Sequence, residues 1–203
     1  ALFAVSAANK TDLPPGKACQ IAVSVEPTDS TLLPGLALLA HRSAKFSAFL
    51  GNAMAARLLV IDPGGFLDSE AFNAQDHAAS LARLAGDHRA AFHLLEMGIE
   101  QSDIACVGQA ASLSAALHQQ ILFNPLLEKT QRIARDIGAA GVCRAHSGTI
   151  LGLLLETDYD ESDLACYCQQ RLPPGVRIFA VDLVNGGVRF EKKMEKPAEV
   201  LSQ

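Results

Sequence analysis

Short apolar runs separated by turn residues predict several strands along this chain. Residues 57–62 give the clearest one, because four aliphatic residues in a row, Leu58 to Ile61, are followed after Asp62 by a Pro-Gly-Gly turn. Residues 35–41 and 45–50 predict two more strands, with a turn at residues 42–44. Residues 176–183 and 187–190 predict the last two, with Asn185 and Gly186 as the hairpin turn between them.

Apolar residues at helical spacing predict a helical middle third. The predicted buried stripe consists of Leu81, Leu84, Ala85, Phe92, Leu95 and Ile99. Ser102 and Asp103 predict an N-cap and a first-turn carboxylate for a helix that ends near His118. Pro125 predicts the first position of another helix, which Gly138 ends. Further helices are expected at residues 1–8 and 17–25, and from the acids at residues 160–163 to the prolines at 173–174.

The segment from Gly141 to Leu155 is an apolar run broken by a polar turn, which predicts a hairpin between two buried strands. Within that turn, Gly148 lets backbone N–H groups approach an anion closely. Ser147 and Thr149 carry hydroxyls that can donate hydrogen bonds to a carboxylate or a phosphate. Taken alone, so short a motif is more often an ordinary polar hairpin turn.

The order strand, helices, strand, turn, strand, helix, strand is typical of a two-layer α+β domain with an antiparallel sheet. Charge and composition argue against some classes of partner. The net charge of -5 over 203 residues, without a basic run, argues against nucleic acid as a partner. No apolar stretch reaches the ~18 residues of a membrane span, so we expect a soluble, cytoplasmic protein without a membrane partner. The five cysteines lack zinc-site spacing and are interpreted as reduced structural thiols.

Four segments in order carry a more specific signal. They are Ser-Val-Glu-Pro-Thr-Asp-Ser-Thr at residues 24–31, Ala-Ala-Ser-Leu-Ser at 110–114, Ala-His-Ser-Gly-Thr at 145–149 and Val-Asn-Gly-Gly-Val at 184–188. Together they resemble the L-threonine kinases of the PduX type, members of the GHMP kinase superfamily. The resemblance runs from about residue 1 to residue 190.

The resemblance implies an ATP- and Mg²⁺-dependent phosphotransferase that phosphorylates the hydroxyl of L-threonine, supplying O-phosphothreonine for the aminopropanol arm of cobalamin. It also implies a ferredoxin-like GHMP kinase C-terminal domain at residues 56–190, preceded by the remainder of the N-terminal domain at residues 1–55. Residues 191–203 are expected to form a tail. A homoserine kinase activity, or a non-catalytic ligand-binding or regulatory domain on the same framework, are the alternatives.

Members of that family carry a Gly-Ser-rich phosphate-binding loop in an N-terminal segment that nothing in this sequence matches. We therefore expect a segment before Ala1 to hold most of the ATP contacts, and residues 1–203 alone to be inactive.

The family motifs also imply roles for single residues. Asp29 matches the position of a catalytic or substrate-orienting acid, although an acid in a Pro-containing loop is often only an Asx-turn or N-cap residue. Glu26 is a candidate ligand of Mg²⁺. The candidate substrate-binding residues are Thr28, Ser30, His146, Ser147, Gly148 and Thr149. The acids around residues 62–70 are interpreted as turn-forming.

Overall fold

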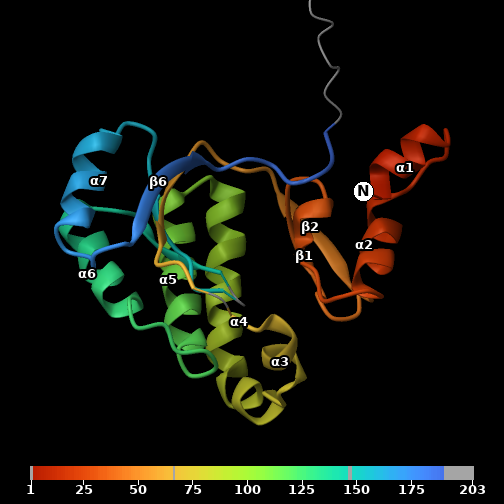
Figure 1. Cartoon of the computed structure of the whole chain (residues 1–203), viewed down its shortest axis with the longest axis horizontal. Helices are drawn as coiled ribbons and strands as arrows, with labels where there is room; N and C mark the ends of the chain where they lie inside the picture. Colours follow the sequence, from red (N-terminus) through yellow and green to blue (C-terminus); the bar gives the residue numbers. More distant parts are fainter. Residues whose placement is uncertain (1, 66, 146–147, 190–203) are drawn as a thin grey trace, which may run out of the picture. The chain divides into compact units, whose positions relative to one another are not determined.

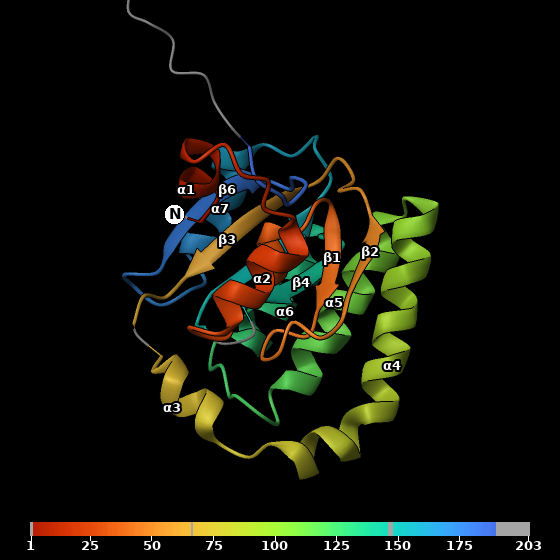
Figure 2. The same cartoon turned by 90° about the vertical axis from the view of Figure 1, so that its right-hand side faces the viewer.

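The structure is a computed structural model that describes residues 2–65, 67–145 and 148–189 (Figures 1 and 2). The chain divides into two compact units. The first combines residues 1–49 with residues 186–203, and the second comprises Leu50–Asn185. Each unit has its own strands and helices.

The first unit contains two short helices and most of a strand pair. Helix α1 spans Leu2–Ala8 and α2 spans Pro15–Val23, as the sequence predicts within two residues. Proline suits the first turn of α2 because the N–H groups there have no partner within the helix. A 3₁₀ turn, η1, follows at Ser30–Leu32. Strands β1, Leu36–Leu39, and β2, Ser47–Gly51, then pair in a two-stranded sheet, which confirms both predicted strands.

The second unit is built on a four-stranded antiparallel sheet. Its strands are β3 (Arg57–Asp62), β4 (Gly141–Arg144), β5 (Leu151–Leu155) and β6 (Arg177–Asp182). They lie in the order β4-β5-β3-β6, and each neighbouring pair is antiparallel. Leu59 at the centre faces Leu153 on one side and Ala180 on the other. The predicted hairpin is confirmed, because β4 and β5 pair on either side of the polar turn.

Helices complete the second unit. They are α3 (Ser69–Ala74), α4 (Ala78–Gln101), α5 (Ile104–His118), α6 (Leu127–Ile137) and α7 (Glu161–Gln169). Helices α4 and α5 lie side by side in both views (Figures 1 and 2). Buried aliphatic residues of the sheet, such as Leu59 and Leu153, pack against Ile133 of α6 and Cys168 of α7. The fold class is therefore α+β, with helices packed on an antiparallel sheet, as predicted. None of the described helices is long and apolar enough to cross a membrane.

Two predicted helix starts are wrong by one or two residues. Ser102 does not cap α5; it ends α4 in the left-handed conformation, with a φ of 55°. Asp103 is the N-cap, and its Oδ1 accepts the N–H groups of Ala105 and Cys106. Helix α6 begins at Leu127 instead of at Pro125. The side chain of Asn124 accepts the N–H of Leu126, so a side-chain turn precedes the helix.

The predicted stripe of α4 is partly wrong. Leu84 and Ile99 are buried, but Leu81 is 47% exposed. The helix buries small residues, Ala91 and Gly98, which the prediction did not include. Gly98 has Val107 of α5 against it, so small residues allow the two helices to pack closely.

The predicted strand at residues 187–190 is also wrong, because described residues 187–189 form no strand and Phe190 lies outside the described residues. Asn185 and Gly186 make no hairpin turn onto β6. Instead, the N–H of Gly186 donates to the Gly35 carbonyl at 3.0 Å, and that of Gly187 donates to the Thr31 carbonyl at 2.9 Å. These bonds to a distant segment of the chain replace the predicted local turn.

Candidate active site

The loop between α2 and η1 carries Asp29, which is the N-cap of η1. Its Oδ1 accepts the N–H of Thr31 at 3.3 Å and the Thr31 hydroxyl at 2.9 Å. The residue is exposed, and no residue in the described parts of the chain donates a hydrogen bond to its Oδ2. The carboxylate is thus held through one oxygen, while the other is open to a further partner.

The residues beside Asp29 differ in how they are held. The N–H of Thr28 donates to the carbonyl of His41 at 3.0 Å, which ties the loop to the turn after β1. Thr28 and Ser30 are half-buried. Glu26 is exposed, and its N–H donates to the carbonyl of Ala22 at 3.1 Å, continuing the hydrogen bonding of α2. The loop therefore has a defined backbone, and its two acids face solvent.

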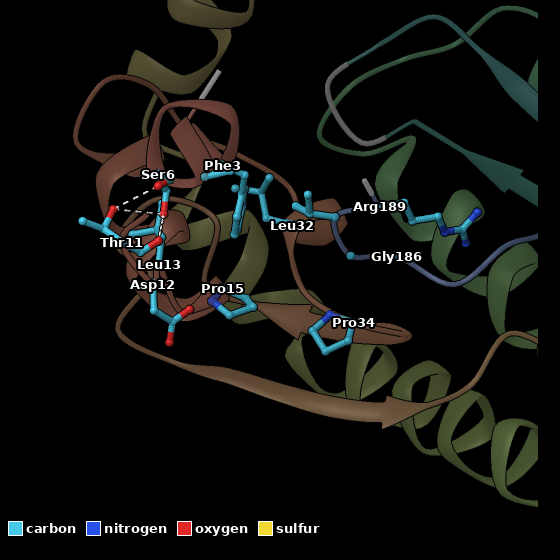
Figure 3. Close-up of a pocket in the computed structure, with 13 residues that line it drawn as sticks. Phe3, Ser6, Thr11, Asp12, Leu13, Pro15, Leu32, Pro34, Gly186 and Arg189 are labelled. Carbon is cyan, nitrogen blue, oxygen red and sulfur yellow. Dashed lines mark hydrogen bonds between the residues drawn. The ribbon is translucent and has the colours of Figure 1, made fainter. Parts of the chain in front are cut away.

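A hollow of about 480 Å³ lies in the same unit, between α1, the α1–α2 loop and residues 186–189 (Figure 3). Leu32 and Pro34 form part of its wall. The Ser6 hydroxyl donates to the Thr11 carbonyl at 2.6 Å, and the Thr11 hydroxyl donates to the Ser6 carbonyl at 3.2 Å. Each of these two hydroxyls thus donates to the backbone carbonyl of the other residue. The carboxylate of Asp12 points away from them (Figure 3). Of the residues predicted for the site, those that the structure describes do not line this hollow.

The second group of predicted site residues lies in the turn between β4 and β5. His146 and Ser147 are outside the described residues. A Cβ on Gly148 would lie 3.2 Å from the Cβ of Ala145, which is a tight approach. The hydroxyl of Thr149 donates to the carbonyl of Gly64 at 3.1 Å. The single hydroxyl proton of Thr149 is therefore already used within the protein.

Gly148 and Thr149 line a hollow of about 260 Å³ in the second unit. Its other walls are formed by Pro63, Gly64 and Leu67 of the loop after β3 and by residues 122–126 between α5 and α6. Phe123 in that loop is 74% exposed. This hollow is mainly apolar, with the polar groups of Asn124 and Thr149 at its wall, as is usual for sites that bind small molecules.

The acids near the loop after β3 have structural partners. Asp62 is buried, its Oδ1 accepts the N–H of Gly64 at 2.8 Å, and its Oδ2 pairs with Arg177. The hydrogen bond from Gly64 lowers the pKa of Asp62, and the Arg177 guanidinium adds to this effect. Asp68 is the N-cap of α3 and accepts the N–H of Ala71 at 2.8 Å. Asp62 thus serves the turn, as interpreted, whereas Asp68 caps a helix.

The five cysteines are all unpaired. Burial raises the pKa of Cys19, of Cys143 and of Cys168, the last to about 11. In the described parts of the chain, no three His, Cys, Asp or Glu side chains come close enough together to hold a metal ion. Among the described residues, Glu26 therefore does not belong to a group of three or more possible metal ligands.

Two residues near the polar turn were missed in the sequence. Asn124 was interpreted as part of a helix start, and Gln119 was not considered. The Nδ2 group of Asn124 donates to the Thr149 carbonyl at 3.0 Å. The only local signal is a polar residue directly before Pro125, which marks the end of regular structure without indicating a distant partner.

Comparison with known proteins gives sequence relatives, although no family model matches. The chain is 30% identical to the L-threonine kinase of Citrobacter freundii over 145 residues, covering 71% of this chain and 50% of that protein. It is 27% identical to the L-threonine kinase of Salmonella typhimurium over 137 residues, covering 68% of this chain and 46% of that protein. The chain thus spans about half the length of the curated relatives it matches.

Solved structures share the fold. A putative homoserine kinase from Listeria monocytogenes superposes with a TM-score of 0.65 at 13% identity, covering 92% of this chain and 64% of that one. Phosphomevalonate kinase from Streptococcus pneumoniae, solved with phosphomevalonate and AMPPNP, gives a TM-score of 0.53 at 13% identity, covering 68% of this chain and 43% of that one. At these identities the likeness establishes the fold, which is that of the GHMP kinases.

Proposed function

Because the chain has the GHMP kinase fold and is a sequence relative of the L-threonine kinases, we propose that the whole protein is an ATP-dependent kinase of L-threonine. It would transfer the γ-phosphoryl group of ATP to the threonine hydroxyl and so produce O-phospho-L-threonine for the side arm of cobalamin in the cytoplasm. The observation that carries this proposal is the 30% identity to an L-threonine kinase over 71% of the chain.

In this proposal Asp29 accepts or orients the proton of the substrate hydroxyl. Phosphoryl transfer requires an aligned hydroxyl and a group that takes its proton, and a carboxylate often serves. The geometry supports Asp29 because Thr31 fixes one carboxylate oxygen while the other is exposed and open to a partner. Thr28 and Ser30, on either side, would contribute contacts to the substrate.

The other proposed substrate-binding residues belong to the polar turn of the second unit. His146, Ser147, Gly148 and Thr149 would close on the substrate or its phosphate. Since the hydroxyl proton of Thr149 goes to Gly64, this residue would offer a ligand only an acceptor oxygen in the described conformation. Donors to an anion would then come from Ser147 and from the backbone N–H groups of the turn.

A magnesium ion bound to ATP would neutralise phosphate charge during the transfer. Such ions are commonly held by one or two carboxylates, by phosphate oxygens and by water. Glu26 fits a role as one of those carboxylates, because it is exposed and close in sequence to Asp29. No further ligand is assigned among the described residues.

Residues 1–55 would then be the remainder of the N-terminal GHMP kinase domain, and residues 56–190 the C-terminal domain. A homoserine kinase is the second candidate, because the putative homoserine kinase from Listeria monocytogenes superposes on 92% of the chain. Homoserine and threonine both present a hydroxyl and an amino-acid backbone, so kinase geometry alone does not separate them.

The test uses protein expressed from the complete coding sequence that contains these residues. It is incubated with ATP, Mg²⁺ and either L-threonine, L-homoserine or L-serine, while ADP release is followed and the phosphorylated product is identified by mass spectrometry. We expect the highest kcat/KM with L-threonine. A higher value with homoserine would favour the second candidate, and phosphorylation of none of the three would overturn the proposal.

A further inference from the structure

Asn124 is a buried polar residue, only 5% exposed, in the loop between α5 and α6. Both the oxygen and the nitrogen of its side-chain amide are hydrogen-bonded. Oδ1 accepts the N–H of Leu126 at 2.9 Å, and Nδ2 donates to the carbonyl of Thr149 at 3.0 Å. The first bond shapes the loop itself, and the second reaches the polar turn 25 residues further along the chain.

The backbone of Asn124 is held by Gln119, at the end of α5. The Gln119 side chain accepts the N–H of Asn124 at 2.7 Å and donates to its carbonyl at 3.0 Å. The same Gln119 oxygen accepts a hydrogen bond from Nη1 of Arg144 at 2.9 Å. Arg144 is the last residue of β4, directly before the polar turn.

The two ends of the turn are therefore bonded to two neighbouring residues, Gln119 and Asn124, which are also bonded to each other. Arg144 before the turn is bonded to Gln119, and Thr149 at its end is bonded to Asn124. Thr149 in addition donates to the carbonyl of Gly64, whose own N–H is fixed by Asp62. Three loops that line the 260 Å³ hollow are joined in this way into one connected set of hydrogen bonds.

We propose that Asn124 is a positioning residue of the active site, and that with Gln119 it fixes the described residues at the two ends of the polar turn, Arg144 and Thr149. This inference rests on the proposed function, in which that turn contacts the substrate. Asn124 acts through the Thr149 carbonyl and needs no contact with the substrate itself. A group that orients a ligand-binding residue in this manner commonly changes affinity about 10–100-fold when it is removed, by analogy with the outer hydrogen bonds of metal sites.

The chemistry of Asn124 allows its two roles to be separated. Asn124→Asp keeps the shape and the Oδ1 acceptor for Leu126, but it replaces the donor to Thr149 with an oxygen that repels the Thr149 carbonyl. Asn52→Asp introduces the same charge at an exposed position and is the matched control. Gln119→Glu is a second variant, which keeps the acceptor for Arg144 and removes only the donor to the Asn124 carbonyl.

The test compares these variants in protein from the complete coding sequence, by two independent readouts. Amide NMR shifts of Gly148, Thr149 and Gly64 measure whether the conformation around these residues changes. Steady-state kinetics with L-threonine measure whether kcat and KM change. For Asn124→Asp we expect shifted amides at these three positions and a KM raised about 10–100-fold, with a smaller change in kcat. Asn52→Asp should change neither readout. If Asn124→Asp does not fold, Gln119→Glu is judged by the same two criteria.

The outcomes separate this inference from the proposed function. Should the natural protein phosphorylate none of the three amino acids, the proposed function fails, and the active-site role inferred for Asn124 falls with it. Where the natural protein is active, unchanged amide shifts in the variant would overturn the positioning role. Shifted amides with unchanged KM and kcat would also overturn it, because Asn124 would then serve the fold alone.

Discussion

The backbones of Gly108 on α5 and Gly141 on β4 meet so closely that neither position has room for a side chain. A Cβ on Gly141 would lie 2.0 Å from the carbonyl oxygen of Gly108, and a Cβ on Gly108 would lie 2.1 Å from that of Ala140. The helix therefore packs directly on the edge strand of the sheet, which leads into the polar turn.

We expect Gly141→Ala to lower the free energy of unfolding by about 3 kcal/mol, since the contact is with backbone that cannot rotate away. Gly86→Ala is the control, because Gly86 lies in helix α4 with nothing within 4 Å of a new Cβ. That change should raise stability by roughly 0.5–1 kcal/mol. Urea unfolding of both variants measures the difference, and equal midpoints would contradict the close packing of α5 on β4.

A second prediction concerns acid stability. The pKa of Asp62 is lowered from its ordinary value of 3.8, first by the hydrogen bond from Gly64 and then by Arg177. A lowered folded-state pKa contributes stability at pH values above the unfolded-state pKa, and this contribution is lost as the pH falls through the folded-state value. Asp62→Asn should therefore have a lower free energy of unfolding than the natural chain at about pH 6. This difference in free energy should be smaller at about pH 2.5.

Chemical unfolding at the two pH values checks this prediction. The control is Asp68→Asn, which removes a carboxylate charge elsewhere but keeps an N-cap residue on α3. A gap between Asp62→Asn and the natural chain that stays constant with pH would show that the carboxylate charge of Asp62 is not stabilising.

The thiols give a third prediction. Burial raises the pKa of Cys168 to about 11, so only roughly one molecule in a thousand carries its thiolate at about pH 8. Cys166, two residues earlier on α7, is exposed. We expect iodoacetamide to modify Cys166 readily and Cys168 only after unfolding, as measured by peptide mass spectrometry. Equal labelling of both in the folded protein would contradict the packing of α7 on the sheet.

Elements with a strong local signal were predicted well. Strand β3 occupies residues 57–62 as predicted. A short aliphatic run that stops before Pro63 and Gly64 is a strong local signal for a strand. The start of α5 was wrong because Ser102 and Asp103 are both capping residues. Only the left-handed conformation of Ser102, with a φ of 55°, decides between them. That conformation depends on how α4 turns into α5, which the local sequence does not specify.

Contacts between distant segments were not predictable. Gly187 donates to Thr31, and Asn124 donates to Thr149, yet nothing in the spacing of these residues indicates a partner. For the candidate site, family motifs indicated Asp29 and the polar turn, whereas Asn124 became visible only through its hydrogen bonds. Side chains that position a loop have no motif of their own, because their partner is a backbone carbonyl that any residue can supply.

The last prediction tests Asp29, for which two roles remain. As the residue that takes or orients the substrate proton, Asp29→Asn should lower kcat roughly 10²–10⁴-fold and change KM little. As an N-cap alone it should behave like Asp103→Asn, because Asp103 accepts two backbone N–H groups at the start of α5 and lies outside the proposed site. Asparagine caps helices nearly as well as aspartate, so both variants should keep their stability within about 1 kcal/mol. Steady-state kinetics on protein from the complete coding sequence separates the roles: equal kcat values for the two variants would leave Asp29 as a capping residue of η1.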